Sequence, residues 1–186
     1  MPLIGLRKRR EGRDAAAALY GHAVAQARLP IFYARLGVPD SLDGRFDLVA
    51  LHVFLLLQRL RQEGAGAKTL AQGLFDVMFA DMDQSLRELG VGDLGVGRRV
   101  KAMAQALYGR IAAYEEGLGG NDQVLAAALA RNLFGTVTAR PQDLAAFCAY
   151  LRREAASLAR QPWAGLRLGR VAFGALTQAQ LSEASH

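Results

Sequence analysis

The sequence predicts an all-α protein: a single compact bundle of six or seven helices, with a basic N-terminal arm and an irregular C-terminal tail. Apolar residues recur at helical spacing along most of the chain, and no strand-like alternation persists. A length of 186 residues with 52% hydrophobic content suits one domain with a substantial core and is short for two. We therefore expect an arm over 1–14, a helical domain over 15–161 and a tail over 162–186.

Three helices are predicted in the N-terminal half of the chain. Asp14 is a suitable N-cap for a first helix over 15–28. A proline at the first position favours a short second helix over 30–37. A turn-rich loop over 38–44 follows. The next helix, over 46–62, is apolar on all sides in its middle, so we expect it to be the central buried helix.

Four more helices are predicted in the C-terminal half, each bounded by glycine or proline. A helix over 69–89 has an apolar stripe and is followed by a glycine-rich loop over 91–97. Helices over 98–116, 122–134 and 141–160 complete the domain. The last of these begins with proline, which is favourable in a first helical turn.

The composition argues against several classes of protein. A single cysteine and three histidines leave no ligand set for a zinc or histidine-rich metal centre, so we expect no metal and no cofactor. The longest apolar run, residues 48–57, is about half of the roughly 20 residues needed to cross a bilayer. The N-terminus places apolar residues before basic ones, the reverse of a secretory signal. We expect a soluble protein of a reducing compartment that could also lie on a membrane surface.

Charge is segregated along the chain. Residues 1–35 carry a net charge of +5, residues 40–93 carry −4 and residues 98–170 carry +6, within a total of +6. A segregated charge distribution is informative about the binding partners of a protein and says little about its fold. It suits phosphates, anionic lipid or RNA, and it equally suits a solvated surface rich in arginine.

A glycine-rich segment before a predicted helix, residues 92–101, is a candidate anion site. Glycine loops that open helices can hold anions, but this one matches neither a Walker A loop nor a dinucleotide fingerprint. Arg98, Arg99 and Lys101 would oppose the helix macrodipole at this position. Their charge indicates either an external anionic partner or internal pairing with an acid such as Asp93.

Acidic residues on the 69–89 helix are the other polar candidates. Asp81 and Asp83 copy the start of a calcium loop whose later ligand positions are missing. Asp76 and Asp83 share one helix face, and Arg87 lies four residues after Asp83. These acids predict a solvated face, a docking surface or, as a third hypothesis, an enzyme using a divalent metal. His52 and Cys148 are expected in the core.

Three segments together resemble the ubiquinol–cytochrome c chaperone family in its bacterial form. They are FYARLGVPDSLDGRFD at 32–47, LAQGLFDVMFADMD at 70–83, and LRELGVGD at 86–93 running into VGRRVK at 96–101. The resemblance covers roughly residues 15–160. It implies an all-helical, non-enzymatic assembly factor for the cytochrome bc1 complex. Mitochondrial members of the family bind newly made cytochrome b, work with a small partner subunit and associate with the ribosome.

This resemblance leads to a functional hypothesis and to candidate residues. We expect a non-catalytic chaperone for cytochrome b or an early intermediate of respiratory chain complex III, in the cytoplasm or peripheral on the cytoplasmic face of the inner membrane. The alternative is a peripheral binder of membrane lipid or ribosomal RNA. The candidate partner-binding residues are Asp40, Asp43, Arg45, Asp47, Phe75, Met78, Phe79, Asp81, Met82, Asp83, Arg98, Arg99 and Lys101. The candidate membrane-surface residues are Arg7, Lys8, Arg9, Arg10 and Arg13.

Several of these candidates have a purely structural alternative. Phe75, Met78 and Met82 fit an ordinary apolar core as well as an adaptable binding surface, whereas Phe79 lies off the centre of the stripe. The charged residues of the 40–47 loop could dock a client, or could equally be caps and internal ion pairs.

Overall fold

The computed structural model describes residues 2–175, with side chains from Arg10 onward except Leu94. The described residues form an all-α fold, which confirms the predicted fold class. In chain order the elements are α1 (Pro2–Ala27), α2 (Pro30–Ala34), α3 (Leu42–Arg61), the 3₁₀ helix η1 (Gly64–Ala67), α4 (Lys68–Glu88), α5 (Asp93–Gly119), α6 (Asp122–Leu133), α7 (Pro141–Ala159) and α8 (Trp163–Leu166).

The central helix α3 is the core of the bundle. Every residue from Phe46 to Leu57 is buried, and α3 contacts α1, α4, α5, α6 and α7. This confirms the central buried helix predicted from its continuous apolar run. The other long helices therefore each bury one apolar face against α3 or against a neighbour of α3.

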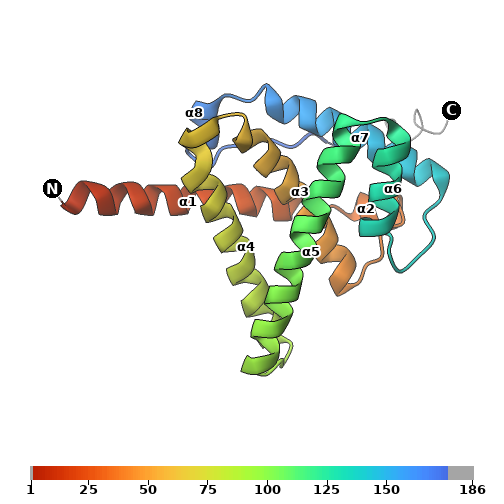
Figure 1. Cartoon of the computed structure of the whole chain (residues 1–186), viewed down its shortest axis with the longest axis horizontal. Coiled ribbons are helices and arrows are strands. Elements are labelled where there is room, and N and C mark those ends of the chain that lie inside the picture. Colours follow the sequence, from red (N-terminus) through yellow and green to blue (C-terminus); the bar gives the residue numbers. More distant parts are fainter. Residues whose placement is uncertain (1, 176–186) are drawn as a thin grey trace.

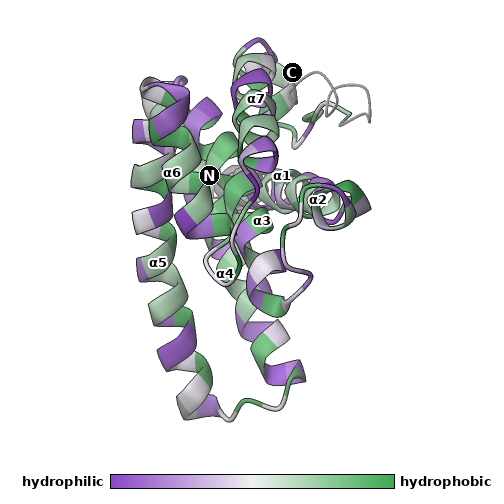
Figure 2. Cartoon of the chain, turned by 90° about the vertical axis from the view of Figure 1, so that its right-hand side faces the viewer, coloured by the Kyte–Doolittle hydropathy of each residue, from purple (hydrophilic) through white to green (hydrophobic). Residues whose placement is uncertain are grey.

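Helices α4 and α5 form a long antiparallel hairpin that extends away from the other helices (Figure 1). The same projection is visible after rotation by 90° (Figure 2). Gly90 lies between the two helices with φ of 80°, a conformation that favours glycine. The hairpin and the start of α3 together define the space in which most of the candidate residues lie.

Three predicted boundaries are corrected by the structure. Helix α1 begins at Pro2, not after Asp14, so the basic segment over residues 2–14 is helical and continuous with the first core helix. Helix α3 begins at Leu42, because the Ser41 side chain accepts a hydrogen bond from the Gly44 backbone N–H at 3.1 Å. The first turn of α3 therefore occupies part of the predicted loop over 38–44.

The third correction removes the predicted glycine-rich anion loop. Helix α5 begins at Asp93, so Gly95 and Gly97 lie inside a helix. Gly92 is the extended N-cap, and the Asp93 carboxylate occupies the first turn, where the macrodipole favours an anion. The basic residues that follow are therefore one to two turns inside the helix and do not open it.

The chain after α7 is also more ordered than predicted. Gln161 exchanges two hydrogen bonds with the Ala172 backbone, at 2.6 and 3.0 Å, and the Glu154 carboxylate accepts one from the Gly174 N–H at 2.7 Å. These contacts hold the segment up to Ala175 against α7. The rest of the predicted tail, residues 176–186, lies outside the described residues.

Candidate functional site

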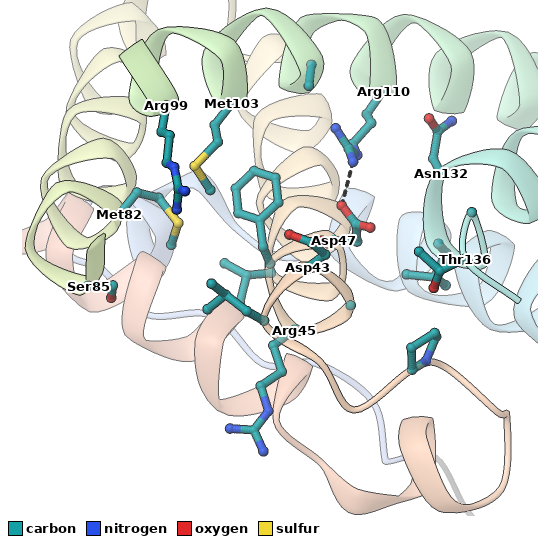
Figure 3. Close-up of a pocket in the computed structure, with 18 of the residues that line it drawn as sticks. Asp43, Arg45, Asp47, Met82, Ser85, Arg99, Met103, Arg110, Asn132 and Thr136 are labelled. Atoms are coloured by element: carbon teal, nitrogen blue, oxygen red, sulfur yellow. Dashed lines mark ion pairs between the residues drawn. The ribbon is translucent and has the colours of Figure 1, made fainter. Parts of the chain in front are cut away.

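A cleft of about 690 Å³ lies between the α4–α5 hairpin, the N-terminal turns of α3, the end of α1 and the loop after α6. Its walls come from segments that are far apart in the sequence, so it exists only in the folded chain. Figure 3 shows side chains from α3, α4 and α5 pointing into a common space. We describe the cleft from its apolar lining outward.

Apolar side chains form much of the lining. Met82 projects from α4 and Met103 from α5 into the cleft (Figure 3). The exposed side chains of Leu42 and Leu89, 56% and 61% accessible, lie at its margin. Methionine adapts to irregular apolar shapes. The cleft therefore offers apolar contact that is not filled by the protein itself.

Helix α5 lines the cleft with one regular face. Arg99, Met103, Ala106 and Arg110 follow one another at spacings of four, three and four residues, which places them on one side of the helix. From Arg99 to Arg110 this face extends about 16 Å along the axis. The cleft is therefore an elongated groove along about three turns of α5.

A largely buried ion pair lies at the Arg110 end of this face. An Arg110 guanidinium nitrogen lies 2.6 Å from Asp47 Oδ1, and the guanidinium also lies 5.6 Å from the centre of the Phe46 ring. Burial raises the pKa of Asp47 to about 6, and the charge of Arg110 opposes that rise. Burial together with the nearby Asp47 also raises the pKa of the enclosed Tyr114 hydroxyl. The ion pair thus connects the N-terminal turns of α3 to α5 in the wall of the cleft.

The remaining charges differ in whether they are paired. Arg45 pairs with Asp40 at 2.7 Å and points away from the cleft interior (Figure 3). Asp81 accepts a hydrogen bond of 2.7 Å from the Tyr20 hydroxyl. By contrast, three arginines line the cleft with guanidinium groups that form no ion pair or hydrogen bond within the described part of the chain. They are Arg28, Arg99 and Arg131.

The fold brings six of the predicted partner-binding residues to this cleft. They are Asp43, Arg45, Asp47, Asp81, Met82 and Arg99. The loop assignment for Asp43, Arg45 and Asp47 is corrected, because all three lie in the first turns of α3.

The other predicted partner-binding residues lie elsewhere. Met78 is fully buried in the core. Phe75 and Phe79 are half-buried, and the Phe75 ring contacts the exposed Tyr108 at a centroid distance of 5.9 Å. Asp83 pairs with Arg87 at 2.6 Å, as the spacing of four residues predicted.

The basic candidates outside the cleft occupy two other surfaces. Arg98 and Lys101 are exposed on α5, and Arg10 and Arg13 are exposed on α1. Arg7, Lys8 and Arg9 lie in α1, and their side chains are outside the described part. Asp93, the proposed internal partner of these cations, instead pairs with Arg87, which bridges it to Asp83.

Several cleft residues were missed by the sequence analysis. The stripe from Arg99 to Arg110 lies within the predicted helix over 98–116 and could have been found from its spacing of three and four residues. Arg28 and Arg131 could not, because they approach the cleft from α1 and α6 only through tertiary packing. Leu42 was overlooked because its helix turn was assigned to a loop.

The structure also bears on the metal and membrane hypotheses. Among the residues described, no three histidine, cysteine or acidic side chains come together as a metal site would require. Asp76, one of the three acids of the metal hypothesis, accepts a hydrogen bond from Gln72 at 2.8 Å.

Within residues 2–175, no helix has the length and apolar character needed to span a membrane.

The described residues form an all-helical scaffold with an amphipathic cleft, an arrangement that can receive a segment of another protein. The sequence model described as ubiquinol-cytochrome C chaperone matches residues 34–173, and the chain belongs to this family. The match confirms the resemblance noted in the sequence. The family is one of assembly factors for ubiquinol–cytochrome c reductase.

Individual relatives agree with this assignment. Ubiquinol-cytochrome-c reductase complex assembly factor 1 of Xenopus laevis is 29% identical over 140 residues, which cover 75% of this chain and 70% of that protein. The Homo sapiens protein is 30% identical over the same share of this chain but only 47% of its own length. The crystal structure of the Cbp3 homolog from Brucella abortus superposes with a TM-score of 0.81 at 36% identity, covering 94% of this chain and 97% of that one.

Proposed function

We propose that this chain is a non-catalytic assembly chaperone that binds cytochrome b, or an early intermediate containing it, during biogenesis of the ubiquinol–cytochrome c reductase complex. The names of the relatives supply the process. The observation that supports the binding mode is the cleft, in which an open apolar lining of Met82, Met103 and Leu42 lies beside charged residues. Such a surface suits a client with apolar helices and charged loops.

The mechanism we propose is transient shielding. The cleft covers an apolar and charged segment of the client until haem and partner subunits take its place. No group of the chain reacts in this scheme. We place the process at the cytoplasmic face of the inner membrane, where the chain would act as a cytoplasmic or peripheral protein, with the ribosome as a further candidate partner.

Site-specific photo-crosslinking tests this proposal. A photoreactive amino acid is placed at Leu42 in the cleft and, as a matched control, at Leu168 outside it, because both side chains are 56% exposed. Crosslinks are formed in the native host, and the products are identified by mass spectrometry. The expected result is cytochrome b crosslinked from position 42 and not from position 168. Equal crosslinking from both positions, or none to any subunit of the complex, would contradict the proposal.

A second candidate function is binding to anionic surfaces. It is favoured by Arg98 and Lys101, which are exposed on α5 and form no ion pair within the described residues. Binding through phosphate contacts weakens steeply as salt is raised, whereas apolar client contacts do not. Sedimentation with anionic vesicles or ribosomes at low and physiological salt separates the two functions, and the double variant Arg98→Ala, Lys101→Ala should weaken only the salt-sensitive component, because the basic residues at the start of α1 remain.

A further inference from the structure

We infer that the cleft accepts a helical protein segment of about three turns that carries an apolar stripe flanked by acidic residues. The inference rests on the proposed function, because it takes the cleft as the client site, and it adds the chemical class of the segment. Three features of the cleft carry it: its length along α5, its unpaired arginines and its mixed charge.

The first feature is shape. The cleft follows the face of α5 from Arg99 to Arg110, and the apolar side chains Met82 and Met103 lie beside Arg99 at one end (Figure 3). Elongated apolar grooves between helices are the usual receptors for amphipathic helices, whose apolar side chains enter at spacings of three and four residues. A segment of about 11 residues matches the length of this face.

The second feature is uncompensated positive charge. Five arginines and three aspartates line the cleft. Arg45 and Arg110 have acidic partners, at 2.7 and 2.6 Å, whereas Arg28, Arg99 and Arg131 have none among the described residues. Arg28 directly follows α1, Arg99 lies in α5 and Arg131 lies in α6, so the unpaired arginines reach the cleft from three different parts of the fold. Carboxylates on both flanks of an apolar stripe would meet them.

The third feature is the presence of acidic residues in the cleft, which favours a protein segment over a polyanion as the occupant. Asp43, Asp47 and Asp81 also line the cleft, and Asp43 has no ion-pair partner in the described part of the chain. Phosphates of a lipid surface or an RNA backbone would be repelled by these carboxylates. A polypeptide can place acidic residues opposite the arginines and leave neutral or basic ones opposite the aspartates. The cleft therefore favours a protein occupant.

Synthetic peptides test the inference with the purified full chain. The probe is a fluorescent helical peptide of about 14 residues, with leucines at helical spacing and glutamates on both flanks. One control peptide has every glutamate replaced by lysine, and another has the same composition in scrambled order. Fluorescence anisotropy at physiological salt should show that the acidic amphipathic peptide binds more tightly than both controls.

Matched variants locate the binding. Arg99→Glu and Arg131→Glu should each weaken binding of the acidic peptide about fivefold and strengthen binding of the lysine peptide. Arg98→Glu makes the same charge change one residue away, on the exposed side of α5, and should change affinity less than about twofold. Circular dichroism melting checks that the variants fold, and Arg99→Gln is a milder substitute that should weaken binding about twofold.

Several outcomes would overturn the inference. Equal affinity for the acidic and lysine peptides would show that charge does not select the occupant. Equal loss in Arg98→Glu and Arg99→Glu would show binding outside the cleft. Displacement of the peptide by vesicles of anionic lipid would assign the arginines to lipid. If crosslinking from Leu42 still identifies cytochrome b in these cases, the proposed function stands and only the acidic segment is rejected. If the chain binds the acidic peptide selectively but position 42 gives no crosslink to cytochrome b, the inference about the acidic segment stands and the proposed function is rejected.

Discussion

The imidazole Nε2 of His52 lies 2.7 Å from the Tyr150 hydroxyl oxygen, so the central helix α3 is hydrogen-bonded to α7 inside the core. The other ring nitrogen, Nδ1, donates to the Leu48 carbonyl at 2.7 Å, which leaves Nε2 to accept from Tyr150. Gln26 on α1 donates to the Tyr150 hydroxyl at 3.1 Å and to the Gly174 carbonyl at 3.0 Å. This chain of hydrogen bonds links three helices and the C-terminal segment.

Replacing Tyr150 by phenylalanine should destabilise the fold. The change leaves the buried Nε2 of His52 and the Gln26 side chain without their shared partner, and an unsatisfied buried polar group costs about 1–3 kcal/mol. Urea unfolding followed by circular dichroism measures the loss. Tyr108→Phe is the control, because Tyr108 is 63% exposed and should change stability by less than about 0.5 kcal/mol. Similar values for both variants would mean that the buried network adds nothing.

The same histidine should make stability depend on pH. Burial lowers the pKa of His52 to about 4, below its ordinary value of 6.5. The unfolded chain therefore binds the proton more readily, and the contribution of neutral His52 is present above pH 6.5 and lost as the pH falls toward 4. Between pH 7 and pH 5 this loss amounts to about 2 kcal/mol.

The variant His52→Gln isolates this effect. Glutamine can donate and accept at the same site but has no charge to gain. Urea unfolding at pH 7 and pH 5 should show that the wild-type chain loses about 2 kcal/mol more than the variant on acidification. An equal change in the two proteins would indicate that His52 is not buried in its neutral form.

Two glycines should respond in opposite ways to alanine. A Cβ at Gly44 would overlap the carbonyl oxygen of Pro39, because the loop before α3 folds back on the first helical turn. Gly44→Ala should therefore cost about 1–3 kcal/mol. Gly97 is exposed inside α5 with no atom near its Cβ position, so Gly97→Ala should stabilise the chain by about 0.5–1 kcal/mol. Thermal melting of the two variants should shift in opposite directions, and a gain for Gly44→Ala would contradict the observed turn.

The helical fold could be predicted from sequence because apolar periodicity is a local property. Helices α6 and α7 were predicted to within one residue of their observed ends; Pro141 marks the start of α7, and in the structure the Asn121 side chain caps α6 by accepting a hydrogen bond from the Val124 N–H. The starts of α3 and α5 were misplaced, because glycine was taken as a breaker. Gly95 and Gly97 are tolerated inside α5, whose other residues are mostly good helix formers and whose inner face packs against the bundle.

The cleft could be predicted only in part. Asp43, Asp47 and Met82 were chosen through the family resemblance, and the fold brings them together with Arg99. The burial of Met78 depends on how α4 packs against α1, which its position in the stripe could not decide. The pairing of Asp47 with an arginine 63 positions later is a tertiary property with no local pattern.

The ion pair between Asp47 and Arg110 allows a direct test of the electrostatics of the cleft. Burial raises the pKa of the Asp47 carboxyl from 3.8 to about 6, and Arg110 restrains the rise. Carbon-13 NMR of the aspartate carboxyl groups should therefore show a midpoint near 6 for Asp47. Arg110→Met removes the restraining charge and should move the midpoint higher. Arg99→Met is the matched control, because Arg99 lines the same cleft without pairing to Asp47, and should leave the midpoint unchanged.

The sign of the linked stability effect follows from the raised pKa. A carboxyl whose folded pKa lies above its unfolded value contributes stability at low pH that is lost as the pH rises through about 6. Because Arg110→Met raises the folded pKa further, the variant should be penalised more at pH 7.5 than at pH 5, where Asp47 is largely protonated. Urea unfolding of Arg110→Met and wild type at these two pH values measures the difference. A penalty that is the same at both would mean that Arg110 contributes through packing on Phe46 and not through its charge.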